Sequence, residues 1–200
     1  MQCKESYPED FKDAFRRSPL KEGELDELVA RSSYPPVFVF GHSMLPTALK
    51  YFADIPQAMK VDMVYATLPG YKLHHFAEEG KPGLPTIKPS LSPAEVVEGM
   101  LVFGLTREQR SDIQEIECVR TGHSMFMAVH VQVSLMDRIH GFEVKCQKTV
   151  DAGTFVWAWN SKDTELLPME TSFWPIDEFL NGQLYANIVD QQNKLQVSDD

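Results

Sequence analysis

The stretch Val37-Phe38-Val39-Phe40-Gly41-His42-Ser43-Met44-Leu45, followed directly by Pro46, indicates where the folded core begins. Its first four residues are apolar and typical of a short buried strand. Gly41 then predicts an abrupt turn in a backbone conformation that glycine adopts most cheaply. Pro46 suits the first turn of a helix over 45–52, because its missing N–H needs no partner there. Free N–H groups at such a turn and helix start favour an anion.

Outward from this stretch, strand patterns outnumber helical ones. Apolar and polar residues alternate over 125–135, as in a half-buried strand. Further strands are expected over 63–67, 71–76, 96–105, 142–150 and 154–159, with a proline- and glycine-rich loop over 77–95. Helices are expected over 106–117, where Thr106 and Gln109 form a capping box, and over 175–184. Because most neighbouring strands lack a helical crossover, we predict an α+β fold: a mixed, mostly antiparallel sheet curled into a small barrel with flanking helices.

The chain divides into three parts by composition. Residues 1–33 are polar, with helical spacing around Leu25 and Leu28, and predict an N-terminal helical appendage. Residues 34–190 contain the apolar strands and form the expected main domain. Residues 191–200 predict a flexible tail.

Charge and composition narrow the class of protein. The 200 residues, 43% hydrophobic, suffice for one sizeable core, and the net charge of −10 argues against nucleic-acid and membrane partners. No apolar run is long enough to span a bilayer and the start lacks a signal peptide, so we expect a cytoplasmic protein. Neither the three cysteines nor the six histidines have a metal-binding spacing, so we expect no metal site. The oligomeric state stays open.

Glu117 is the most informative polar residue. It follows Ile116 directly and Ile113 by four positions, so it borders the apolar stripe of the expected helix. It also lies in the last turn, where the helix dipole disfavours a carboxylate. Both effects would raise its pKa and suit it to proton transfer. The alternative is a glutamate at a helix end that simply reaches solvent.

Two other groups admit several interpretations. The Gly41 turn could be ordinary punctuation between strand and helix, an anion cradle, or a nucleophile elbow with Ser43, although Leu45 stands where that motif needs glycine. Phe155, Trp157 and Trp159 share one face of a strand, and they could pack in the core or form the floor of a pocket.

Taken in order, these segments resemble the gamma-glutamylcyclotransferase-like family, including its plant avirulence-induced branch. The matching pieces are Val37–Leu45, Ala66-Thr67-Leu68-Pro69-Gly70-Tyr71, Leu84-Pro85-Thr86-Ile87, Val97-Glu98-Gly99-Met100-Leu101, Ile113-Gln114-Glu115-Ile116-Glu117 and Phe155-Val156-Trp157-Ala158-Trp159-Asn160. The resemblance runs from about Val37 to Leu180.

The resemblance implies a catalytic role for Glu117 and a small-molecule substrate. Glu117 would accept a proton from the substrate's α-amine, which attacks the γ-carbonyl, and would then protonate the departing amine, leaving 5-oxoproline. The substrate would be bound by Phe40, Gly41, His42, Ser43, Met44 and Phe126, mainly through backbone N–H groups of the Gly41 turn. No metal or organic cofactor is implied.

Two alternatives to cyclotransfer stay open. Phe40 and Phe126 stand where the family has tyrosine, and Gln114 stands where it has aspartate. A more apolar pocket favours another proton transfer, such as an isomerisation or cyclisation of a small apolar metabolite. A non-catalytic binding protein is the remaining alternative.

Overall fold

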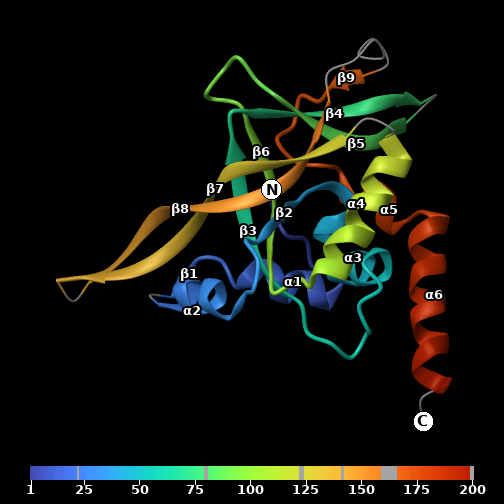
Figure 1. Cartoon of the computed structure of the whole chain (residues 1–200), viewed down its shortest axis with the longest axis horizontal. Helices are drawn as coiled ribbons and strands as arrows, with labels where there is room; N and C mark the ends of the chain where they lie inside the picture. Colours follow the sequence, from blue (N-terminus) through green and yellow to red (C-terminus); the bar gives the residue numbers. More distant parts are fainter. Residues whose placement is uncertain (22, 79–80, 122–123, 141, 159–165, 199–200) are drawn as a thin grey trace.

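The computed structural model describes residues 1–21, 23–78, 81–121, 124–140, 142–158 and 166–198 (Figure 1). Helices flank a barrel, and a long two-stranded arm projects from it. The elements in chain order are α1 Glu9–Arg16, β1 Leu20–Lys21, α2 Glu24–Arg31, β2 Val37–Val39, the 3₁₀ turn η1 Gly41–Met44, α3 Pro46–Phe52, β3 Asp62–Pro69, β4 Tyr71–Glu78, β5 Lys81–Pro89, β6 Val96–Phe103, α4 Arg107–Thr121, β7 Ser124–Ile139, β8 Phe142–Trp157, β9 Leu166–Pro168, α5 Ile176–Leu180 and α6 Gln183–Ser198.

The main sheet closes on itself. Its strand order is β1-β7-β3-β6-β2-β8, and the additional pairing of β7 with β8 joins the two sides into a barrel. β1 pairs with β7, and β2 with β8, in parallel, whereas β3, β6, β7 and β8 pair with their other neighbours antiparallel. A second sheet, β5-β4-β9, lies beside the barrel. The predicted α+β fold with a mixed, mostly antiparallel barrel is therefore confirmed.

The barrel is filled by the apolar residues that the strand patterns placed on one face. On β7, Val129, Val131 and Val133 are buried while His130 between them is exposed, as the alternation predicted. Gly99 on β6 is required by close packing, since a Cβ there would lie 2.4 Å from the Val39 carbonyl oxygen. The buried interior sets the position of β2 and of the turn that follows it.

Two strands differ from the sequence prediction. Residues 81–89, expected to be loop, form β5, which pairs with β4 at the edge of the second sheet. An edge strand tolerates proline because one row of its N–H groups needs no partner. β8 runs unbroken from Phe142 to Trp157 instead of breaking at residues 151–153, because it pairs along its whole length with β7.

The two ends of the chain are more integrated than the sequence indicated. In the expected appendage, Phe11, Leu20, Leu25 and Leu28 are buried in the main core, and β1 extends the barrel sheet. At the other end, α6 continues to Ser198, through most of the expected tail. Gln192 on α6 is buried and its side-chain amide donates to the Thr47 carbonyl at 3.0 Å. Contacts distant in sequence, which local composition does not reveal, order both ends.

Candidate functional site

The Gly41 turn has the backbone that the sequence predicted. Gly41 has a φ of +65°, in the left-handed region, and begins the 3₁₀ turn η1. A Cβ on Gly41 would lie 2.4 Å from Cγ of Pro85 on β5, so space as well as backbone angle demands glycine. Phe40 and the whole turn, from Gly41 to Met44, are buried. The turn thus follows β2 directly and packs against Pro85 of β5.

The side chains of His42 and Ser43 in this turn are buried against neighbouring elements. The His42 ring meets Phe52 edge-on at 4.9 Å between centroids and lies 5.6 Å from the ring of Phe179. Ser43 is buried, and among the described residues only Asp54 and His140 combine a side chain with a positive φ. Ser43 therefore lacks the strained backbone of a nucleophile elbow, which argues against the serine-hydrolase interpretation. Binding of a ligand through the backbone N–H groups of Gly41 to Ser43 stays a prediction.

The start of α3 has an acceptor from within the chain. The Asp10 carboxylate on α1 accepts hydrogen bonds from the Thr47 backbone N–H at 3.0 Å and from its hydroxyl at 2.6 Å. This carboxylate also complements the positive end of the helix dipole. The anion that the sequence predicted at this helix start is therefore the Asp10 carboxylate of the chain itself. The preceding turn η1 remains the candidate site for a ligand carboxylate.

Helix α4 carries Glu117 on a polar face. The capping box at its start is confirmed, with the Thr106 N–H donating to Gln109 Oε1 at 2.9 Å and the Gln109 N–H donating to Thr106 Oγ1 at 3.2 Å. Ile113 is buried and Glu117 is half-buried. Arg110, Gln114 and Glu117 follow i, i+4, i+7 spacing and lie on one face. The helix contacts α3, β5, β7 and β8.

Phe126 lies against α4 from the barrel side. Its ring covers Gly153 of β8 so closely that a Cβ there would lie 1.9 Å from Phe126 Cζ. It meets Phe155 edge-on at 5.2 Å and is 40% exposed. Phe155 and Trp157 are themselves buried, Trp157 against Phe76 at 5.3 Å, and Trp159 lies outside the described residues. These aromatics form a packed layer in which Phe126 stays partly exposed.

A cleft that the sequence did not single out lies beside this ring. It measures about 310 Å³ and is lined by Tyr34, Arg107, Arg110, Ser111, Gln114 and Phe126. The Arg110 guanidinium lies 5.4 Å from the Phe126 ring centroid and 5.6 Å from that of Tyr34. The helical spacing of Arg110, Gln114 and Glu117 was the signal available in the sequence. Tyr34, just beyond the expected appendage, had no such signal.

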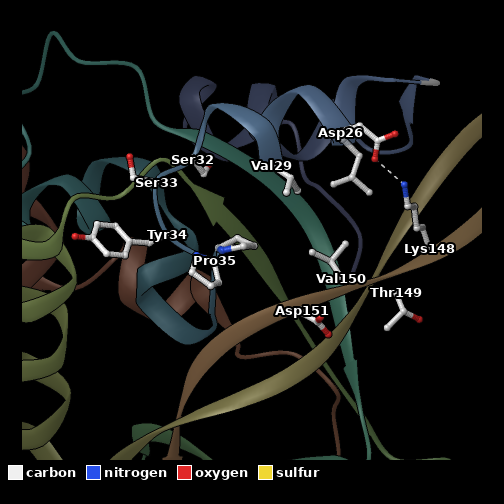
Figure 2. Close-up of a pocket in the computed structure, with 12 residues that line it drawn as sticks. Asp26, Val29, Ser32, Ser33, Tyr34, Pro35, Lys148, Thr149, Val150 and Asp151 are labelled. Atoms are coloured by element: carbon white, nitrogen blue, oxygen red, sulfur yellow. Dashed lines mark hydrogen bonds and ion pairs between the residues drawn. The ribbon is translucent and has the colours of Figure 1, made fainter.

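A second cavity, of about 490 Å³, lies between α2 and β8 (Figure 2). Val29 and Val150 face each other across it, and an ion pair between Lys148 and Asp26, 2.7 Å long, spans one end. The Tyr34 side chain points away from this cavity, toward α4. None of the predicted site residues lines it, and Tyr34 is the residue that it shares with the cleft beside Phe126.

The described residues also bear on metal binding and on membrane-spanning helices. In that part of the chain, no three His, Cys, Asp or Glu side chains are grouped so that they could hold a metal ion. None of its helices is both long and apolar enough to cross a membrane.

The family of the chain is established by its sequence match. The chain belongs to the gamma-glutamyl cyclotransferase, AIG2-like family, whose model matches residues 37–175. The match contains the Gly41 turn, Pro85, Glu117 and Phe126.

The solved structures reported next share little sequence identity with this chain. A search of curated proteins finds no match. Among solved structures, the chain is similar to a protein of Arabidopsis thaliana whose structure was determined in solution. The sequence identity is 16%, the TM-score is 0.47, and the match covers 86% of this chain and 98% of that one. It is also similar to a protein named gamma-glutamyl cyclotransferase, with 19% identity, a TM-score of 0.43 and coverage of 80% and 85%.

Proposed function

We propose that this protein is a cyclotransferase that releases 5-oxoproline from a small γ-glutamyl amine, with Glu117 as the acid–base residue. The Gly41 turn binds the glutamyl α-carboxylate through its backbone N–H groups. Phe40, His42, Ser43 and Met44 shape that turn, and Phe126 borders the amine end of the substrate. The reaction requires neither a metal nor an organic cofactor.

The observation that carries the proposal is the contact between Gly41 and Pro85. These residues belong to two separate pieces of the family pattern, and the fold packs one on the other while holding Gly41 in the left-handed region. Glu117 supports it from α4, which contacts both β5 and α3 on either side of this turn. The half-buried position of Glu117 suits a carboxyl group that must both accept and donate a proton.

The reaction follows from these positions. Glu117 takes a proton from the substrate's α-amine as the amine nitrogen attacks the γ-carbonyl carbon. The new C–N bond closes the five-membered ring, the bond from that carbon to the leaving nitrogen breaks, and Glu117 delivers its proton to the leaving nitrogen. Binding the α-carboxylate at the Gly41 turn orients the amine for attack, which lowers the entropic cost of ring closure.

The proposal is tested by measuring 5-oxoproline released from γ-glutamylalanine, γ-glutamylethylamine and γ-glutamylhexylamine. Glu117→Gln should lower the rate by about 10²-fold or more, because it keeps the size and polarity but removes proton exchange. The matched control is Glu115→Gln, which removes the same charge from an exposed position on the same helix and should leave the rate unchanged. Wild-type turnover by a normally folded Glu117→Gln protein would refute the acid–base role. Absence of 5-oxoproline with every substrate would refute cyclotransfer.

A second function in the same site is favoured by Phe126. Its partly exposed ring, in edge contact with Phe155, offers an apolar surface where the family has a tyrosine. A proton transfer on a less polar metabolite, catalysed by Glu117, would use that surface. Retention of an apolar small molecule by the wild type, with its loss in Phe126→Ala and no 5-oxoproline formation, would favour this second function.

A further inference from the structure

Arg110 is held in a defined position at the mouth of the α4 cleft. Its guanidinium lies between the Tyr34 and Phe126 rings, and its Nη1 donates to the Pro35 carbonyl. Aromatic faces attract a guanidinium, and the carbonyl bond fixes its rotation. An arginine offers five N–H donors, and the described residues use only the one on Nη1. The remaining donors are available for a ligand.

The cleft concentrates positive charge on an acidic protein. Arg107 lines it together with Arg110, whereas the net charge of the chain is −10. Within the described part of the chain, neither arginine forms an ion pair with a carboxylate. Burial lowers the pKa of Arg110, partly offset by Tyr34. The Ser111 hydroxyl and Gln114 amide add neutral polar groups that can also contact an anion.

The position of the cleft relates it to Glu117. Arg110 and Glu117 are seven residues apart on one face of α4, which separates their Cα atoms by about 10 Å along the helix axis. Gln114 lies between them and lines the cleft. The Phe126 ring lines the same cleft and contacts Arg110 from the barrel side. A molecule whose reacting nitrogen is at Glu117 could therefore lay an apolar stem past Phe126 and reach Arg110 with its far end.

We propose that Arg110, assisted by Arg107, binds a terminal carboxylate on the amine portion of the substrate, with Phe126 packing against the stem between. This inference rests on the proposed function and narrows its substrate class to γ-glutamyl amines with an anionic end. A carboxylate matches the planar guanidinium in a bidentate arrangement. The cleft would thus select the leaving group, while the Gly41 turn holds the glutamyl group common to all such substrates.

The experiment compares γ-glutamyl-6-aminohexanoate with γ-glutamylhexylamine, which differ only in the terminal carboxylate. The wild type should prefer the carboxylate in kcat/KM by about 10- to 100-fold, through KM, as a charge-assisted hydrogen bond can provide. Arg110→Gln should abolish the preference, mainly by raising KM for the carboxylate substrate. Arg138→Gln, an exposed arginine on β7, is the control and should keep the preference. Arg107→Gln, at the rim, should reduce it by about two- to fivefold and covers the case in which Arg110→Gln misfolds.

The outcomes separate this inference from the proposed function. Turnover of both substrates without preference would overturn the carboxylate site and leave the cyclotransferase proposal standing. If neither releases 5-oxoproline, the cyclotransferase proposal fails, and calorimetry with N-acetyl-6-aminohexanoate and N-acetylhexylamine decides the site. Selective binding of the carboxylate by the wild type, lost in Arg110→Gln, supports it, and equal or absent binding overturns it. Inorganic phosphate that binds the wild type more tightly than the carboxylate probe would also overturn it.

Discussion

The Gly41 turn and the polar face of α4 flank the proposed site and are built in different ways. The turn is wholly buried, and its histidine is packed between Phe52 and Phe179. The α4 face presents long polar side chains, of which Arg110 and Glu117 are half-buried. Because its side chains are packed inside, the turn would contact a ligand chiefly through its backbone N–H groups. Under the proposed function, recognition of the shared glutamyl group is therefore assigned to the turn, and substrate choice is assigned to α4.

The largest effect on folding is expected from Gly41→Ala. The substitution adds a Cβ 2.4 Å from Pro85 Cγ at a φ of +65°, so overpacking and backbone strain act together. We expect a loss of about 2–5 kcal/mol in the free energy of unfolding, measured by urea denaturation. Gly70→Ala is the control, because Gly70 has a φ of +75° with no atom within 4 Å of the added Cβ. A loss of about 1–2 kcal/mol is expected there, and equal losses at both sites would show that Pro85 does not clamp the turn.

The barrel that supports both regions contains a hydrogen-bonded carboxylate, Glu98 on β6, whose contribution to stability depends on pH. Its carboxylate accepts hydrogen bonds from the Met1 ammonium, the Tyr65 hydroxyl and the Ser172 hydroxyl. Burial acts to raise the Glu98 pKa, but the hydrogen bonds together hold it below its ordinary value. Because the folded-state pKa is depressed, this stabilisation is complete above about pH 5.3, one unit above the ordinary glutamate pKa. It is lost as the pH falls through the folded-state pKa of Glu98.

Glu98→Gln should therefore lower the free energy of unfolding by about 1–3 kcal/mol at neutral pH. The deficit should shrink as the pH falls below the ordinary carboxyl range, because the wild-type carboxylate then becomes protonated. Thermal denaturation of both proteins between pH 3 and 7 measures this. A deficit that does not vary with pH would mean that Glu98 contributes through packing rather than charge.

A smaller effect distinguishes the two ends of the β7–β8 hairpin. Phe126→Leu removes the edge contact with Phe155 and the stacking of Arg110, at an expected cost of about 1–2 kcal/mol. Phe142 lies at the far end of the same hairpin and is 74% exposed, so Phe142→Leu should stay within about 0.5 kcal/mol of the wild type. Equal effects in chemical denaturation would indicate that the Phe126 ring is not held against α4.

The smallest effect is expected from Ser43→Ala. A turn that acts through its backbone loses little when a buried hydroxyl is removed, so 5-oxoproline release should stay near the wild-type rate, with a stability loss of about 1 kcal/mol. A nucleophilic serine would instead cost about 10⁶-fold in rate. Labelling of the wild type with a fluorophosphonate probe provides the independent readout. A stoichiometric adduct on Ser43 would move the chemistry from α4 to the turn.

The sequence by itself determined the local elements whose signals lie within a few residues. The glycine after Val37–Phe40 predicted a left-handed turn, and its φ of +65° confirms it. Thr106 and Gln109 predicted a capping box, and both bonds are present. The alternation over 125–135 predicted a half-buried strand, because strand period and burial are coupled residue by residue. The scarcity of helical crossovers between neighbouring strands predicted the α+β barrel class.

Only the tertiary structure decided which distant segments meet. The proline-rich residues 81–89 became β5 because β4 offered an edge to pair with, and Asp10 became the cap of α3 because α1 packs beside it. Arg110 acquired its position between Tyr34 and Phe126 in the same way. These contacts join residues separated by long stretches of chain, and their energies depend on burial and geometry that no local pattern records. The sequence therefore indicated the candidate acid–base residue, whereas the cleft proposed to select its substrate emerged from the packing of α4 against the barrel.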